Sequence, residues 1–308
     1  MILTKNPSFR SGTKYVAQTT INFHIANSRD SHPAQVFQVK TNMPYFKTKD
    51  GCSIFYETQG FESSKPVVAF LNGTMQSTVY WKPHSLSLKD RFRVLMYDAR
   101  AQGKSDSGEG KLSLEGHAED FSELLKHLRV EKAHLIGLSH GANVALAYAA
   151  HSPEGVERLV LCSAATRQTC RAKLILKSWL DVLKNSDLET LAWVSLPVAF
   201  GENFLKKQQK NLGNMVKAIV KRNHKTALIA HFEAMTLYPP LSQIAQYVHC
   251  PVLVVSGSDD LLVNESDAEQ LAMICGGRHK HLTEIGHSIP AEAPEIFTKT
   301  ALEFLDRA

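Results

Sequence analysis

The sequence lacks the features of several large classes of protein. No apolar run approaches the roughly 18 residues that a membrane-spanning helix needs, so no transmembrane segment is expected. The composition, with 44% hydrophobic and 21% charged residues, 17 glycines and 12 prolines, excludes collagen-like, low-complexity and wholly disordered chains. A chain of 308 residues therefore suits one large α/β domain, or a domain with an insertion.

Disulfide, metal and cofactor motifs are also missing. The five cysteines are scattered and form no Cys-x-x-Cys pair, which predicts neither a disulfide framework nor a zinc knuckle and favours a reducing cytoplasm. The 14 histidines have no metal-binding spacing such as His-Glu-x-x-His. The run Gly108-Glu109-Gly110 is no dinucleotide fingerprint, because Ser113 stands where a third glycine is needed. We therefore expect no metal and no cofactor.

Charge is nearly balanced overall but not along the chain. The net charge of +5 is too small to indicate a nucleic-acid partner. Residues 165–249 hold 12 Lys and Arg residues but 5 Asp and Glu residues, a net charge of +7. The simple interpretation is a solvated helix face. The alternative is docking of an acidic acyl carrier protein, coenzyme A or an anionic membrane surface. The candidate docking residues are Lys206, Lys207, Lys210, Lys217, Lys221 and Arg222.

Residues 1–42 are expected to form an N-terminal extension. They are polar, and they lack the unbroken apolar segment of a secretory signal. An organelle transit peptide would share their basic bias, but no basic amphipathic helix is evident. The role of this segment is left open.

From residue 43 onward, short apolar runs alternate with stretches of helical periodicity. Strands that alternate with helices imply right-handed crossovers and a mostly parallel central sheet flanked by helices. The expected strands are 53–58, 66–71, 92–97, 133–138, 158–162, 251–256 and 279–285, and the expected helices are 113–128, 142–150, 265–274 and 292–305.

This alternation stops between residues 165 and 249. Helical periodicity takes over there, and so long a helical stretch between two strands of one sheet indicates an inserted helical lid and not a crossover. We therefore expect an α/β core of residues 43–164 and 250–308 and a lid of residues 165–249. One apolar stripe of the lid is expected to comprise Leu174, Ile175, Trp179, Leu180 and Leu183.

The segment Gly137-Leu138-Ser139-His140-Gly141 carries the clearest chemical signal. Its Gly-x-Ser-x-Gly pattern is weak alone, but an expected strand leads into it and an expected helix leaves it, as in the sharp turn that exposes a nucleophilic serine. Gly137 and Gly141 would let neighbouring backbone pass close to the turn. The helix N-terminus would favour negative charge at Ser139.

A nucleophilic serine needs a general base and an acid that orients it. For this type of turn the chain order is serine, acid, histidine. Two later strands end in suitable residues: one in Asp259 and Asp260, the other in His287. These residues are expected at the edge of the sheet that carries Ser139.

With these residues the chain resembles the α/β-hydrolase superfamily, specifically its lid-bearing branch of esterases, lactonases and related acyl-processing enzymes. The resemblance covers roughly residues 43–307. That family places its acid in a Gly-x-x-Asp pattern, which selects Asp260 over Asp259, and its base in a Gly-His pattern, which selects His287. The resemblance therefore implies a catalytic triad of Ser139, Asp260 and His287.

The resemblance also implies an oxyanion hole of two backbone N–H groups. One belongs to His140, which follows Ser139, and the other to Thr74 in the loop after the second core strand. Relatives usually have His-Gly in that loop, whereas this chain has Asn72-Gly73. Because the donor is a backbone group, the change does not threaten catalysis, and Gly73 would let the Thr74 N–H face inward.

The primary hypothesis is a serine hydrolase that cleaves a carboxylic ester or thioester of a small-molecule or acyl substrate through an acyl-enzyme. An acyltransferase that uses acyl carrier protein or coenzyme A thioesters would employ the same residues, with an alcohol in place of water. Residues 72–75 also resemble the corresponding loop of the synthase that joins two 3-hydroxyacyl chains in rhamnolipid biosynthesis. A non-catalytic binding protein of this fold is a third alternative, against which the complete set of Ser139, Asp260 and His287 argues.

Overall fold

The computed structural model describes residues 44–110 and 112–306. The extension expected at residues 1–42 lies outside the described residues. In the described part of the chain, no helix combines the length and apolar character needed to cross a membrane. The five cysteines are all described and are free thiols.

Eight strands form one sheet in the order β1-β2-β4-β3-β5-β6-β7-β8. The pairs β1–β2 and β2–β4 are antiparallel, and every other neighbouring pair is parallel. All residues of β3, β5 and β7 are buried, as expected for parallel strands covered on both faces. The strands are β1 (Tyr45–Lys47), β2 (Ser53–Gln59), β3 (Val67–Leu71), β4 (Arg93–Tyr97), β5 (Ala133–Leu138), β6 (Val156–Cys162), β7 (Val252–Gly257) and β8 (Arg278–Leu282).

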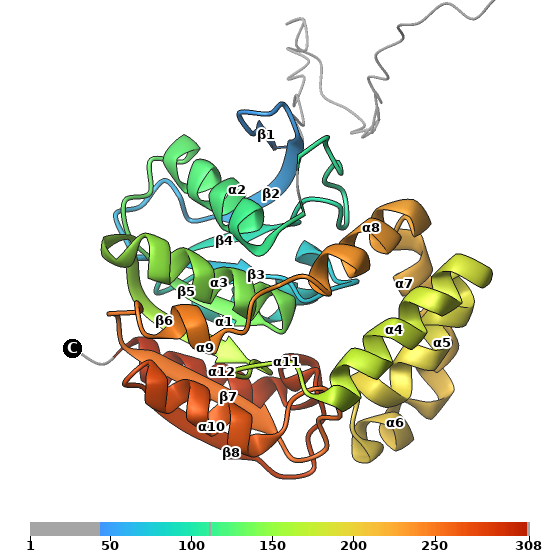
Figure 1. The fold of residues 1–308 in the computed structure, drawn as a ribbon. Helices are drawn as coiled ribbons and strands as arrows, with labels where there is room; N and C mark the ends of the chain where they lie inside the picture. Colours follow the sequence, from blue (N-terminus) through green and yellow to red (C-terminus); the bar gives the residue numbers. More distant parts are fainter. Residues whose placement is uncertain (1–43, 111, 307–308) are drawn as a thin grey trace, which may run out of the picture. The chain divides into compact units, whose positions relative to one another are not determined.

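Helices cover both faces of this sheet (Figure 1). Successive side chains of β3 point to opposite faces: Val67 and Ala69 pack in one apolar cluster, and Val68 and Phe70 pack in the other. The first cluster includes residues of α2 (Leu114–His127), α3 (His140–His151), α9 (Ser242–Ala245) and α10 (Glu265–Ile274). The second includes residues of α1 (Lys82–Leu88), α11 (Ile289–Glu292) and α12 (Pro294–Leu305). The expected α/β-hydrolase architecture is thus confirmed.

Between β6 and β7 the described chain forms helices and no strand. Figure 1 shows α4 to α8 gathered beside the sheet, at the right of the view. Two apolar clusters hold these helices, one centred on Trp179 and Phe232, the other on Leu196 and Val216. The helices are α4 (Cys170–Asn185), α5 (Leu188–Ala199), α6 (Glu202–Gln208), α7 (Leu212–Arg222) and α8 (Lys225–Met235).

Two local expectations are wrong. The strand expected at 279–285 ends at Leu282 and is followed by a turn in which Glu284 has a positive φ of 59°. In α4, Leu174 is 67% exposed, and the buried stripe runs instead through Leu176.

Candidate active site

Ser139 lies in a strained turn between β5 and α3. Its φ of 54° and ψ of −117° fall outside the regions that residues with a side chain prefer. A Cβ on Gly137 would lie 2.5 Å from Ala142 Cα, and a Cβ on Gly141 would lie 2.2 Å from the carbonyl oxygen of Leu71. Glycine is therefore required at both positions for the turn to form.

His287 and Asp260 are hydrogen-bonded to one another. The Nδ1 atom of His287 lies 2.8 Å from Oδ2 and 3.0 Å from Oδ1 of Asp260. Oδ1 also accepts the backbone N–H groups of Leu262, at 2.8 Å, and Val263, at 3.0 Å. Asp259 instead accepts the hydroxyl of Ser258 at 2.8 Å. Of the two candidate acids, Asp260 is therefore the one that contacts the imidazole.

Ser139 and His287 line one cavity of about 390 Å³. The cavity lies where the ends of β3, β5 and β7 meet the helices between β6 and β7. Gly73 and Thr74 also line it, so four residues predicted for the catalytic triad or the oxyanion-hole loop share its wall. Most of the remaining wall is apolar. It includes Trp179, Leu196, Phe200, Met215, Phe232 and Met235 from these helices.

The loop after β3 is fixed by side-chain amides. Asn72 Nδ2 donates to the carbonyl oxygen of Tyr97 at 2.7 Å and to Asp98 Oδ1 at 3.3 Å. Gly73 donates its backbone N–H to Gln76 Oε1 at 2.9 Å. Asn72 therefore anchors this loop to the end of β4. His140, which follows Ser139, is the first residue of α3, where backbone N–H groups have no partner within the helix.

Two residues that hold the His287 loop gave no signal in the sequence. The Glu292 carboxylate accepts backbone N–H groups from Gly201 and Gly286, both at 2.9 Å, and from Ser288 at 3.1 Å. Ser163 Oγ donates to the carbonyl oxygen of His287 at 2.7 Å. Glu292 thereby links the loop to the helices between β6 and β7. Only the folded contacts reveal this role, because they join residues that are far apart in the sequence.

Arg222 departs from its expected place on a basic surface. It lines the cavity, and its Nε donates to the carbonyl oxygen of Ala218 at 2.8 Å. Burial lowers the pKa of its guanidinium group. Among the described residues of the cavity wall it has the one permanent charge, and none of them is a carboxylate. The other five candidate docking residues, Lys206, Lys207, Lys210, Lys217 and Lys221, are exposed.

Comparison with known proteins identifies the family. The family model described as the alpha/beta hydrolase fold matches residues 66–294. The chain is 24% identical over 250 residues to a proposed carbamate hydrolase of Agrobacterium fabrum, covering 79% of this chain and 94% of that protein. It is 24% identical over 275 residues to a bifunctional esterase/perhydrolase of Acinetobacter calcoaceticus, covering 85% of this chain and 99% of that protein.

The solved structures point to the same family. The enol-lactonase of Burkholderia xenovorans superposes with a TM-score of 0.79 at 26% identity, covering 86% of this chain and all of that one. The family match spans most of the described sheet and both sides of the helical segment. The chain therefore belongs to the α/β-hydrolase family and is a hydrolase.

Proposed function

We propose that this hydrolase cleaves a carboxylic ester or thioester through a covalent acyl-enzyme on Ser139. The observation that carries the proposal is the contact between His287 Nδ1 and the Asp260 carboxylate, with the imidazole in the same cavity as Ser139. Asp260 fixes the tautomer in which Nδ1 bears the proton. The other ring nitrogen is then the base that faces the substrate.

The proposed reaction has two halves. His287 Nε2 takes the proton of Ser139 Oγ as this oxygen attacks the substrate carbonyl carbon, and the oxyanion accepts the backbone N–H groups of Thr74 and His140. The tetrahedral intermediate collapses, and the leaving alcohol or thiol takes the proton from Nε2. In the second half His287 deprotonates a water molecule that attacks the acyl carbon. The carboxylic acid leaves and Ser139 recovers its proton.

Residues 165–249 are proposed to form the lid of this site, inserted into a core of residues 43–164 and 250–308. The support is that α4, α5, α7 and α8 all contribute apolar side chains to the cavity wall. A wall of this kind excludes bulk water from the reacting carbonyl and strengthens the electrostatic stabilisation of the oxyanion.

The substrate is proposed to carry an anionic group at the end remote from its reacting carbonyl. Arg222 is a partly buried cation in a cavity whose described wall has no carboxylate. Removing a charge from water is costly unless a counter-charge replaces the lost hydration. A substrate carboxylate would supply that counter-charge, and an arginine fork suits it in shape.

Acyl transfer from an acyl carrier protein is the second candidate. Its support is the set of five exposed lysines on and near α6 and α7, the helices that border the cavity. Lys206 is already paired with Glu202 at 3.2 Å, an exposed pair that contributes little to binding a partner. Turnover of an acyl carrier protein thioester that falls on reversal of Lys207, Lys210 and Lys217 would favour this candidate over a small ester.

Labelling by a fluorophosphonate probe tests the nucleophile. The unaltered chain is expected to be labelled and Ser139→Ala is not, while both retain the same thermal unfolding midpoint. Ser195→Ala is the matched control, because Ser195 also lines the cavity but donates its hydroxyl to the carbonyl oxygen of Ala192 at 2.8 Å. Equal labelling of Ser139→Ala, or none of the unaltered chain, would contradict the proposal and would favour a non-catalytic binding protein.

A further inference from the structure

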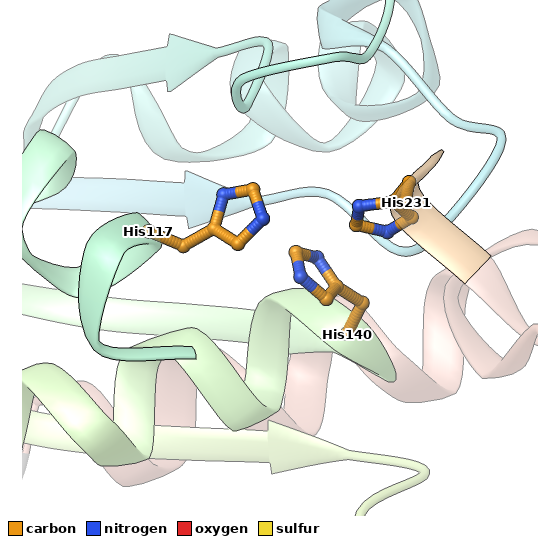
Figure 2. Close-up of side chains that lie close together, drawn as sticks. All are labelled: His117, His140 and His231. Carbon is orange, nitrogen blue, oxygen red and sulfur yellow. The ribbon is translucent and has the colours of Figure 1, made fainter. Parts of the chain in front are cut away.

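Three buried histidines meet beside the proposed active site. Figure 2 shows His117 from α2, His140 at the start of α3 and His231 from α8. One ring nitrogen of each lies within 4.8 Å of those of the other two. The ring centroids are 4.5 Å apart for His140 and His231, 4.8 Å for His117 and His140, and 5.6 Å for His117 and His231.

The cluster has unused hydrogen-bonding capacity. Within the described part of the chain, both ring nitrogens of His117 and Nδ1 of His231 are buried and have no hydrogen-bond partner. A buried polar atom without a partner costs about 1–3 kcal/mol. Three such atoms at one place indicate that a ligand belongs there.

The chemistry of the three rings selects a cation. Burial lowers the pKa of His231 to about 4 and the pKa values of His117 and His140 well below the usual range, so all three are neutral at pH 7. A neutral imidazole offers a lone pair, which is the form that binds metal ions. Imidazoles without carboxylates favour zinc, copper or nickel over magnesium and calcium.

We propose that His117, His140 and His231 bind one Zn²⁺ ion. A tetrahedral site with Zn–N bonds of about 2.0–2.1 Å needs ligand nitrogens roughly 3.4 Å apart, so the rings would have to close by at most about 1.5 Å. His140 would exchange its contact to Tyr238 Oη, at 3.2 Å, or to Gln102 Nε2, at 3.4 Å, for the ion. The fourth ligand would be a water molecule, and Thr74 Oγ1, 3.3 Å from His231 Nε2, would hold that ring through the nitrogen that does not bind the ion.

The proposed ion would have a structural role. None of the three histidines belongs to the described wall of the substrate cavity, whereas Thr74, Phe232 and Met235 do. The ion would join α8, which carries Phe232 and Met235, to the turn that holds Ser139. It would thereby position the apolar wall of the cavity and the proposed oxyanion donor of His140 without contacting the substrate.

This proposal departs from the expectation that the chain binds no metal. No spacing rule could find the site, because long stretches of chain separate the three residues. Ligands from α2, α3 and α8 are brought together only by packing of the helical segment on the core. The proposal does not rest on the chemistry assigned to Ser139.

Zinc titration of the untagged full chain tests the proposal. After treatment with a chelator, the chain is titrated with Zn²⁺ by calorimetry and with Co²⁺ by absorption spectroscopy. We expect one ion per chain, the visible bands of tetrahedral cobalt, and a higher thermal unfolding midpoint with zinc bound. Ser139→Ala should bind zinc equally well, which separates this proposal from the proposed function.

Substitutions decide where the ion binds. His117→Phe and His231→Leu, which fill the site with apolar groups, should each weaken zinc binding by about 100-fold or more. The matched control is His281→Gln. His281 and His279 are a close pair of histidines in β8, and each contacts Ser256 Oγ at 2.8 Å. Absence of stoichiometric zinc or cobalt binding, or a loss with His281→Gln and none with His117→Phe, would overturn the proposal.

Discussion

The imidazole of His287 contacts both carboxylate oxygens of Asp260, at 2.8 Å and 3.0 Å. Two backbone N–H groups bind the same carboxylate, and the Asp260 side chain is completely buried. The carboxylate therefore has a fixed orientation before substrate arrives. Asp259 has the same charge one residue away, yet it has none of these contacts, which makes the two aspartates a natural test pair.

Asp260→Asn is expected to lower kcat for ester hydrolysis by roughly 10³–10⁴-fold with little change in KM. The amide cannot hold the imidazole in the tautomer that leaves Nε2 free to accept the serine proton. Steady-state kinetics with p-nitrophenyl esters measure the effect. Asp259→Asn is the control and should stay within a few-fold of the unaltered chain. Equal losses from both substitutions would show that neither carboxylate has the proposed orienting role.

The turn at Ser139 should tolerate no side chain at Gly137. In Gly137→Ala the new Cβ would meet the backbone of Ala142, so we expect a loss of about 1–3 kcal/mol or more in the free energy of unfolding. Gly213→Ala is the matched control. A Cβ there meets nothing within 4 Å and the residue lies in α7, so this change should stabilise by about 0.4–1 kcal/mol. Urea denaturation measures both values, and similar stabilities would contradict the steric argument.

The order of strands and helices, and the position of the site at the carboxyl ends of the parallel strands, could be predicted from the sequence. Both follow from patterns of neighbouring residues. Continuous apolar runs mark the buried parallel strands, and the glycines around Ser139 mark the turn. The orientation of Arg222 could not be predicted, since a basic helix residue has the same local sequence whether it faces solvent or a cavity. The meeting of His117, His140 and His231 could not be predicted either, since it depends on the packing of three helices that are far apart in the sequence.

Arg222 should determine preference for an anionic substrate. Arg222→Gln is expected to lower kcat/KM for a p-nitrophenyl monoester of a dicarboxylic acid by about 10–100-fold. The reason is that a hydrogen bond to a charged group contributes about 1.5–3 kcal/mol. Hydrolysis of a neutral ester of equal length should change little. Lys207→Gln removes an exposed charge nearby and should leave the ratio of the two rates unchanged. If Arg222→Gln left the ratio of kcat/KM for the anionic ester to that for the neutral ester unchanged, Arg222 would have no role in substrate recognition.

The free energy of unfolding should decrease in mild acid, because one histidine of the sheet and one of α1 are buried. Burial lowers the pKa values of His134 and His84 to about 4, whereas both rings take up a proton near pH 6.5 in the unfolded chain. The unfolded state therefore binds more protons between pH 6.5 and 4, and the free energy of unfolding decreases as the pH falls through this range.

His134→Phe isolates one of these contributions. His134 lies in β5, and its ring packs edge-to-face against Phe92. Because Nδ1 of His134 has no hydrogen-bond partner among the described residues, an apolar ring fits these surroundings. The substitution should reduce the loss of stability between pH 6.5 and 4 by an amount on the order of 1–3 kcal/mol. Urea denaturation at several pH values measures the slope. His127→Phe is the control for the exchange of an imidazole for a benzene ring, because His127 is exposed and lies near Phe46 and Tyr56. Parallel curves for His134→Phe and the unaltered chain would contradict the prediction.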